Sequence, residues 1–162
     1  MRIELTSDFE RPAPTIAELL LKPETMCFLL HPVVRVVPRS PDRFPARWEV
    51  GRYRVSMWLF GFIPLGSQDI VITEIVADPV ASRWGLHDDG SGSLTRRWDH
   101  RIKLEALAEG RARYTDRVEI EAGLMTPAAW LFARLVFAWR HRRWRQLTAA
   151  PPRQPSRHQP LS

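Results

Sequence analysis

The amino-acid sequence predicts one α+β domain in which an antiparallel sheet packs on a long C-terminal helix. From residue 47 onward, segments with alternating apolar and polar residues are separated by short turns, which is typical of an antiparallel meander. A long helical segment follows from Thr126-Pro127. The chain has 162 residues, 44% hydrophobic and 26% charged, which is enough for one core and too few for two.

The first thirty residues predict a strand and two short helices. Residues 2–9 alternate in polarity as a strand does. Thr15 and Glu18 have the spacing of a capping box, so a helix is expected over 16–21. A second helix is expected over 23–30, since it begins with proline and ends before a His-Pro step.

The middle of the chain predicts a loop followed by strands and turns. Residues 38–45 hold three prolines and are expected to form a loop. Residues 47–62 are rich in β-forming side chains, with Gly51 marking a bend or turn. The elements expected after them are a turn at 63–66, a strand over 68–76, a turn at 77–79, a strand over 81–87, a turn at 88–92 (Asp-Asp-Gly-Ser-Gly), and strands over 94–107 and 111–122.

The last helix and the tail are separated by two consecutive prolines. The helix is expected from Pro127, with Thr126 as its N-cap, to about Thr148. The domain is therefore expected over residues 1–149. Residues 150–162 hold four prolines and no aromatic side chain, and we expect this tail to be disordered.

Cysteine content and hydropathy predict a cytoplasmic protein. Cys27 is the single cysteine, so no internal disulfide can form, and its apolar neighbours favour a core position over a nucleophile. The N-terminus does not resemble a signal peptide. The longest apolar stretch, 127–139, contains Arg134 and is too short to cross a bilayer.

Motifs for cofactors and metals are absent from the sequence. No phosphate-binding loop, dinucleotide fingerprint or nucleophile elbow occurs. The five histidines are scattered, and no pair has the spacing of a metal site. We therefore expect neither a metal nor a cofactor.

Two long predicted strands bring a histidine and an aspartate together. In 94–107 and 111–122 the even-numbered residues form the apolar, inward face. A three-residue loop at 108–110, with Gly110 left-handed, pairs His100 with Val118 and Asp116 with Ile102. His100 and Asp116 then become diagonal neighbours on the inner face, where only the phenol of Tyr114 adds another ionisable group.

A buried His–Asp pair allows three interpretations. A carboxylate in apolar surroundings needs a partner, so His100 and Asp116 can be a structural hydrogen-bonded pair. The same pair can be the polar anchor of an apolar pocket, where it orients a hydroxyl or carbonyl of the ligand. It can also act as an acid/base pair in catalysis.

Aromatic and apolar side chains are the further candidates for a pocket wall, although each can equally be part of the core. Around residues 57–60 both faces are apolar, so alternation does not say which side points inward. Residues 60–65 could also form an apolar rim at a pocket mouth or an edge that touches lipid. The candidates are Tyr53, Met57, Trp58, Phe60, Trp84, Trp98, Tyr114, Trp130, Leu131 and Phe137.

Positive charge is concentrated at the end of the chain. Residues 122–162 carry seven arginines and no acidic residue, while residues 1–121 sum to a net charge of −1. Arginines at a helix C-terminus complement the helix dipole. With an interleaved tryptophan they can also dock on an anionic membrane surface, and nucleic acid or a partner protein are further alternatives. The residues concerned are Arg140, Arg142, Arg143, Trp144 and Arg145.

The order of elements and three short motifs resemble a known superfamily. These motifs lie at residues 9–14 (Phe-Glu-Arg-Pro-Ala-Pro), at 98–100 with 114–118 (Trp-Asp-His and Tyr-Thr-Asp-Arg-Val), and at 139–144 (Trp-Arg-His-Arg-Arg-Trp). Over residues 1–148 the chain resembles small bacterial members of the START/Bet v 1-like (SRPBCC, polyketide cyclase-like) superfamily. The resemblance implies a helix-grip fold with a hydrophobic cavity between the sheet and the last helix.

The resemblance and the residues together favour a non-enzymatic binder or carrier of a small hydrophobic molecule, such as a lipid, an isoprenoid or an aromatic or polyketide-like compound. One alternative is a cyclase or dehydratase that uses His100 and Asp116 for proton transfer without a cofactor. Another is an interaction module that docks through the arginine-rich helix end. The sequence does not choose among these ligands or fix the oligomeric state.

Overall fold

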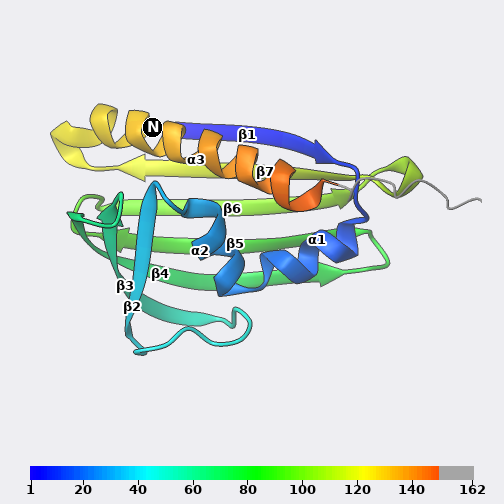
Figure 1. Ribbon diagram of the computed structural model, residues 1–162, viewed down its shortest axis with the longest axis horizontal. Coiled ribbons are helices and arrows are strands. Elements are labelled where there is room, and N and C mark those ends of the chain that lie inside the picture. Colours follow the sequence, from blue (N-terminus) through cyan, green and yellow to red (C-terminus); the bar gives the residue numbers. More distant parts are fainter. Residues whose placement is uncertain (150–162) are drawn as a thin grey trace, which may run out of the picture.

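A seven-stranded antiparallel sheet organises residues 1–149, the part of the chain that the computed structural model describes (Figure 1). The strand order is β1-β7-β6-β5-β4-β3-β2, so β2 to β7 form a meander and β1 returns to pair with β7. The strands are β1 (Arg2–Phe9), β2 (Val34–Ser40), β3 (Gly51–Leu59), β4 (Ile63–Asp78), β5 (Arg83–Gly92), β6 (Arg97–Ala106) and β7 (Ala112–Glu121).

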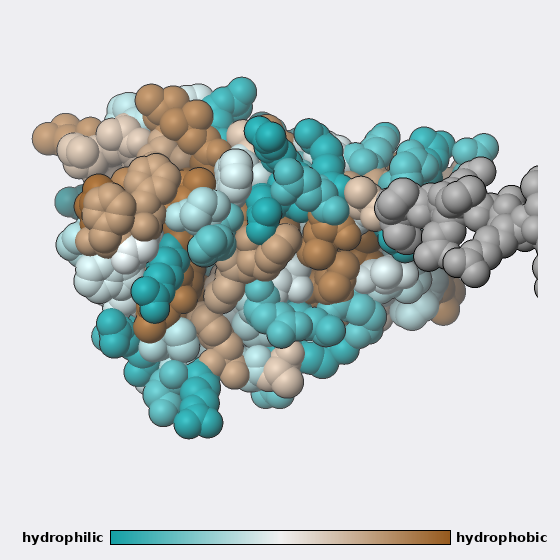
Figure 2. Space-filling model, in the orientation of Figure 1, coloured by the Kyte–Doolittle hydropathy of each residue, from teal (hydrophilic) through white to brown (hydrophobic). Residues whose placement is uncertain are grey.

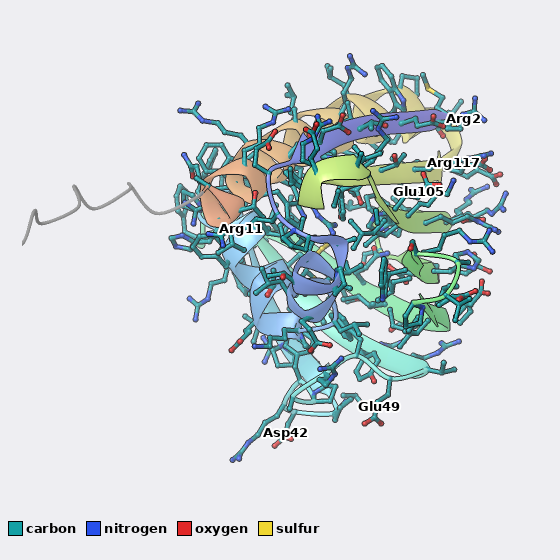
Figure 3. All side chains as sticks on the ribbon, turned by 90° about the vertical axis from the view of Figure 1, so that its right-hand side faces the viewer. Arg2, Arg11, Asp42, Glu49, Glu105 and Arg117 are labelled. Carbon is teal, nitrogen blue, oxygen red and sulfur yellow. The ribbon has the colours of Figure 1, made fainter. Side chains whose placement is uncertain are left out.

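Three α-helices lie on the concave side of this sheet (Figure 3). The first two, α1 (Ala13–Leu20) and α2 (Pro23–Leu30), connect β1 to β2. The last, α3 (Thr126–Thr148), packs on β1, β7 and α2. Short 3₁₀ turns at Ala108–Gly110 and Gly123–Met125 precede β7 and α3. Among the described residues, no helix is long and apolar enough to cross a membrane.

The core consists of two clusters of apolar side chains. The larger one joins α1, α2 and the centre of the sheet to the end of α3, where Phe9, Tyr114 and Trp144 are packed with ring centroids 5.4–6.0 Å apart. The smaller one joins the first half of α3 to β1 and β7 through side chains such as Ile3 and Phe137. Helix α3 therefore contacts the sheet along most of its length, as a helix-grip fold requires.

The predicted register of β6 and β7 is confirmed. His100 pairs with Val118 and Ile102 pairs with Asp116. Gly110 has a φ of +70° in the connecting turn, where the absence of a Cβ removes the steric cost of a left-handed backbone. On the inner face of these strands, Leu104, Tyr114, Val118 and Ile120 are all buried. Alternation alone therefore placed the inner face of this hairpin correctly.

The predicted turn at 88–92 is wrong, because these residues continue strand β5. The strand runs from Arg83 to Gly92, and Asp88 pairs with His100 across to β6. At Gly90 an added Cβ would lie 2.1 Å from the carbonyl oxygen of Asp69. The glycine thus allows β4 and β5 to approach closely. This close approach, and not a turn, explains the glycine at this position.

Other boundaries of the sheet also differ from the prediction. The expected turn at 77–79 is shifted, since β4 runs to Asp78 and β5 begins at Arg83. Part of the expected loop 38–45 belongs to the edge strand β2, which tolerates Pro38 because an edge position leaves one side of the backbone unpaired. The expected turn at 63–66 lies within β4. The chain reverses earlier, at residues 60–62, where Phe60 and Gly61 both have positive φ.

The helix caps also differ in detail. Helix α1 begins at Ala13, and its N-cap Pro12 makes no side-chain cap, so Thr15 and Glu18 lie inside the helix and form no capping box. Thr126 is the first residue of α3 rather than its N-cap. Its hydroxyl accepts from the Ala122 amide and donates to the Gly123 carbonyl. The expectation of a disordered tail over 150–162 falls outside the described residues.

Replacing Gly90 by alanine is expected to destabilise the fold, because the new Cβ meets backbone that cannot rotate away. We expect a loss of about 2 kcal/mol or more in the free energy of unfolding, measured by urea denaturation. Gly51→Ala is the control, because its nearest neighbour would be 3.8 Å away, on the Tyr53 side chain. Equal midpoints for the two variants would contradict the close approach of β4 and β5.

Candidate functional site

A cavity of about 170 Å³ lies between helices α2 and α3 and the concave face of the sheet. Strands β2 to β6 supply one side of its wall, and one face of α3 supplies the other. Most of the wall is apolar, with side chains that include Val34, Val55, Met57, Ile70, Trp98, Phe132, Ala133, Val136 and Phe137. Such a wall excludes water from an apolar molecule that occupies the cavity.

A smaller cavity of about 50 Å³ lies next to the first. The two share five lining residues, of which three are polar: Asp88, His100 and Arg140. Asp88 and His100 are direct cross-strand partners on β5 and β6, and Arg140 reaches them from α3. The cavity system therefore has apolar walls and one charged region where the two cavities meet.

The carboxylate of Asp116 holds this charged region in place. Asp116 is fully buried on β7 and accepts hydrogen bonds at Oδ1 from His100 Nε2 (2.7 Å) and from the hydroxyl of Tyr114 (2.9 Å). Its Oδ2 accepts from His141 Nε2 (3.1 Å) and lies 3.7 Å from Arg140 Nε. Both oxygens are thus engaged by groups from β6, β7 and α3.

The partners of Asp116 keep it ionised. Burial on its own would raise the pKa of Asp116, since the charged form loses its hydration. The positive charge of Arg140 and the hydrogen bonds from His100 and His141 outweigh that effect and hold the pKa well below its usual range. Asp116 is therefore a permanent anion, and it neutralises the buried charge of Arg140.

His100 is neutral and has a defined tautomer. A carboxylate only accepts hydrogen bonds, so the Nε2 atom that faces Asp116 carries the hydrogen. Burial lowers the pKa of His100 despite the neighbouring carboxylate, which leaves the ring uncharged near pH 7. Its Nδ1 then bears a lone pair and has no hydrogen-bond partner within residues 1–149. Because His100 lines both cavities, this lone pair is available to a ligand.

Arg140 is held from two sides. One terminal nitrogen, Nη2, donates to the Tyr114 hydroxyl at 2.7 Å, and the guanidinium lies 5.5 Å over the ring of Phe137. Asp116 and Tyr114 raise the pKa of Arg140 although its burial opposes this, so the charge is retained. Its Nη1 makes no hydrogen bond in the described part of the chain, and its buried Nε, 3.7 Å from Asp116, makes none either, so Arg140 retains donors at the junction of the cavities.

A second chain of contacts links this region to the first strand. His141 Nδ1 lies 2.8 Å from the hydroxyl of Ser7 on β1, and Ser7 also accepts a hydrogen bond from Arg145 (3.1 Å). The first strand and the last helix are therefore connected through the same set of polar groups that fixes Asp116.

Asp88 is the other buried acid, and its environment differs from that of Asp116. Its Oδ1 accepts from the backbone amide of Val71 (2.7 Å), beside an irregular register in the β4–β5 pairing between Ile72 and Glu74. Burial raises the pKa of Asp88 to about 7, because no cation lies within ion-pair distance among the residues described. Near neutral pH this carboxyl group therefore exists in both the protonated and the ionised form.

Comparison with known proteins assigns the chain to a family. The sequence model of DUF8410, described as a domain of unknown function, matches residues 7–148. The chain belongs to the DUF8410 family. No curated protein matches it.

Solved structures share the fold of this DUF8410 chain at low sequence identity. A protein from Chromobacterium violaceum is 16% identical with a TM-score of 0.68, covering 93% of this chain and 98% of that chain. A START superfamily protein from Mycobacterium smegmatis is 12% identical (TM-score 0.59; 91% and 96% covered). A major latex-like protein from Panax ginseng is 9% identical (TM-score 0.56; 93% and 98% covered). The predicted START/Bet v 1-like, helix-grip α+β fold is confirmed.

The structure divides the sequence-predicted pocket residues of this DUF8410 chain into three groups. Met57, Trp98, His100 and Phe137 line the large cavity. Tyr53, Tyr114 and Asp116 are buried but line neither cavity, so Asp116 can affect a ligand only through His100 or Arg140. The remaining candidates lie away from both cavities: Trp58, Phe60, Trp84, Trp130 and Leu131.

Two of these candidates are largely exposed and line neither cavity. Phe60 is 56% exposed because it forms the β3–β4 turn. Leu131 is 54% exposed because it lies on the outer face of α3. Trp130 is partly buried against the smaller core cluster, and its indole nitrogen donates to the backbone oxygen of Arg2.

The expected basic docking surface at the end of α3 is wrong for two of its five members. Arg140 and Trp144 are buried, because the helix turns these positions toward β7 and α1. Arg142 and Arg145 are exposed. The guanidinium of Arg143 lies 3.9 Å over the ring of Phe28 on α2.

Asp88, Arg140 and Gln68 are site residues that the sequence analysis missed. Asp88 was assigned to a turn, and Arg140 was counted among surface charges. A signal was present for Arg140, because it follows the buried Ala133 and Phe137 by seven and three residues and thus shares their helix face. Gln68 is more than nine-tenths buried at the cavity wall, and its Nε2 has no hydrogen-bond partner among the described residues.

The group with metal-ligand chemistry lies outside the cavity. Within residues 1–149, His87, Asp89 and Asp99 bring ligand atoms within 4.8 Å of one another. Asp99 is already bound by Arg97 and Arg101. A cation would have to displace these arginines, so the cluster fits an ion-pair network better than a metal centre.

The charge of Asp116 is expected to be essential for stability. Asp116→Asn leaves Arg140 as an uncompensated buried charge, which costs about 3–5 kcal/mol of unfolding free energy. Urea denaturation measures the loss. Asp8→Asn, which breaks an exposed ion pair with Arg113, is the control and should cost under about 1 kcal/mol. A similar small loss in both variants would show that Asp116 does not carry the network.

The raised pKa of Asp88 predicts a pH dependence with a defined sign. The group binds its proton more tightly in the folded state (about 7) than at its ordinary 3.8, so folded-state stability falls as pH rises between these values. Between pH 5 and pH 8, the unfolding free energy of the wild type should fall by roughly 2–3 kcal/mol more than that of Asp88→Asn. Thermal or urea unfolding at both pH values measures this difference. Asp8→Asn, at an exposed position, should show the same change with pH as the wild type. If Asp88→Asn also shows the same change with pH as the wild type, the prediction is contradicted.

Proposed function

We propose that this protein binds a small hydrophobic molecule in the cavity between the sheet and helix α3. The supporting observation is the cavity of about 170 Å³, whose apolar wall ends at a region of unpaired polar groups. Binding sites for small molecules combine these two properties, since apolar contact supplies affinity and a few polar groups fix orientation.

The size of the cavity favours a compact ligand. An apolar cavity of about 150 Å³ in another protein holds a benzene molecule. A cavity of about 170 Å³, with a neighbouring space of about 50 Å³, fits a one- or two-ring aromatic or a short isoprenoid without rearrangement. A lipid with two acyl chains would require the sheet and helix to separate.

The polar region favours a ligand that carries an oxygen. Gln68 Nε2 and Arg140 Nη1 are donors without partners in the described chain, and His100 Nδ1 is an acceptor. An unpaired buried donor costs about 1–3 kcal/mol, so a ligand oxygen that accepts from these groups stabilises the complex. A carbonyl or hydroxyl group on an apolar body meets this requirement.

The surface at one end of the molecule is also apolar. Figure 2 shows apolar side chains gathered where α3 begins, and the exposed Leu124, Met125 and Leu135 lie in or next to this segment. Ala129 and Phe132 of the same segment line the cavity. An apolar ligand or a membrane surface would meet apolar groups at this end, which agrees with the role of a carrier.

Filling the cavity is expected to abolish binding without unfolding the chain. Ala133→Phe places a ring in the cavity, and affinity for 2-naphthol should fall at least about tenfold by titration calorimetry. Leu135→Phe is the matched control, because Leu135 is exposed on the same helix and should leave affinity unchanged. Circular dichroism of both variants measures whether they are folded.

Native mass spectrometry of the purified protein, together with mass spectrometry of its organic extract, would identify the class of the natural ligand. A bound apolar compound in stoichiometric amount would support the proposal. The proposal fails if the wild type binds no apolar probe, or if Ala133→Phe binds 2-naphthol as tightly as the wild type does.

A further inference from the structure

Two buried titratable groups face each other at the junction of the cavities. Asp88 and His100 are directly opposite on β5 and β6, which places their Cβ atoms about 4.5–5.5 Å apart on the inner face. Both side chains line both cavities. Each retains one polar atom, Oδ2 of Asp88 and Nδ1 of His100, that has no hydrogen-bond partner in residues 1–149.

We propose that Asp88 and His100 act as the acid and the base in the enolisation of a small apolar carbonyl compound, with Arg140 binding the carbonyl oxygen. The inference rests on the proposed function, because the carbonyl compound has to bind in the cavity first. It adds a chemical step that binding alone does not require.

His100 has the properties of the base. Its Nε2–H is fixed on Asp116, so the lone pair is at Nδ1, and burial keeps the ring unprotonated near neutral pH. When Nδ1 takes up a proton, the resulting imidazolium is stabilised by the carboxylate of Asp116 at 2.7 Å. Asp116 is thus a positioning residue that never contacts the ligand.

Asp88 has the properties of the acid. Its Oδ1 is held by the Val71 amide, and burial raises its pKa to about 7, so below this pH Asp88 carries the proton that an acid has to donate. The surroundings raise the proton affinity of Asp88 and lower that of His100. Such an opposite effect on two neighbouring groups is typical of an acid/base pair. Asp116 lines neither cavity and remains ionised, so it cannot serve as the acid.

Arg140 supplies the positive charge where negative charge develops. Its Nη2 is fixed by Tyr114 and its Nε faces Asp116, so the guanidinium does not rotate freely. The remaining Nη1 is a donor for an oxygen at the junction. A fixed donor in a water-poor site stabilises an enolate oxygen without reorganisation.

The proposed step balances without a cofactor or co-reactant. His100 Nδ1 removes a proton from the carbon next to the carbonyl, the C–H electron pair becomes a C=C bond, and the carbonyl π pair moves to the oxygen beside Arg140. Asp88 then donates its proton to that oxygen, which gives a neutral enol. The imidazolium of His100 returns its proton to Asp88, so the net change is the conversion of a ketone to its enol.

The charged groups around the pair define the expected pH profile. His100 is faced by Asp116 of β7 and Arg140 of α3, and Asp99 on its own strand contributes. Asp88 is influenced by Asp89, Asp99 and Arg140. The rate should be highest while His100 is neutral and Asp88 is protonated, and it should fall as pH rises through about 7.

The test follows deuterium uptake by 2-tetralone, a two-ring ketone, in D₂O with the full-length protein. Proton NMR measures loss of the hydrogens next to the carbonyl, and saturation-transfer NMR in the same tube measures binding. We expect the wild type to exchange these hydrogens at least about tenfold faster than buffer. His100→Gln and Asp88→Asn should each lower the rate about tenfold, to near the buffer rate, while 2-tetralone still binds.

The control residues lie outside the cavities. His87→Gln and Asp8→Asn change a histidine and an exposed aspartate that line neither cavity, and both should keep the wild-type rate. In Asp88→Asn the residual exchange should also lose its fall near pH 7, which a purely structural role of Asp88 would leave in place.

The outcomes separate this inference from the proposed function. Binding of 2-tetralone without faster exchange overturns the enolisation and leaves ligand binding intact. Wild-type exchange rates in His100→Gln or Asp88→Asn also overturn it. If the wild type binds neither 2-tetralone nor 2-naphthol, both the inference and the proposed function are overturned.

Discussion

The buried carboxylate of Asp116 is the interaction on which the rest of this structure depends. It accepts hydrogen bonds from His100, Tyr114 and His141 and compensates the charge of Arg140. A single anion thereby connects β6, β7 and α3, and through His141 it also connects β1. Removing a charge from water is costly unless its partners are arranged around it, so the position of α3 on the sheet follows from this arrangement.

The same interaction sets the chemistry of the cavity. Because Asp116 uses its oxygens on protein groups, its effect on a ligand is indirect: it orients the ring of His100 and holds the guanidinium of Arg140 at the wall. Asp88 lies on β5, on the other side of β6, and has no cation within ion-pair distance in the described chain, so burial raises its pKa. Two buried aspartates that flank β6 thus differ in proton affinity, because one has a buried arginine beside it and the other does not.

The sequence predicted the fold and the contact between His100 and Asp116, but it did not predict the positions of Asp88 and Arg140. Alternation in β6 and β7, together with the three-residue turn, was enough to bring His100 beside Asp116, because strand geometry fixes which side chains face each other. Asp88 was missed because Asp-Asp-Gly-Ser-Gly has turn composition, and only the close approach of β4 explains why Gly90 lies in a strand. The exposure predicted for Arg140 and Trp144 was wrong, because the charged segment was treated as one surface and the face of the helix on which each residue lies was not considered.

The contacts between Ser7 and the last helix have a consequence for the synthesis of the chain. Ser7 is synthesised 134 residues before His141 and 138 residues before Arg145, its two partners on α3. Until then, β7 would carry Asp116 without Arg140, which is an unfavourable state for a buried anion. Because α3 also supplies one side of the cavity wall, the polar network around Asp116 and the cavity are completed only once α3 has been synthesised.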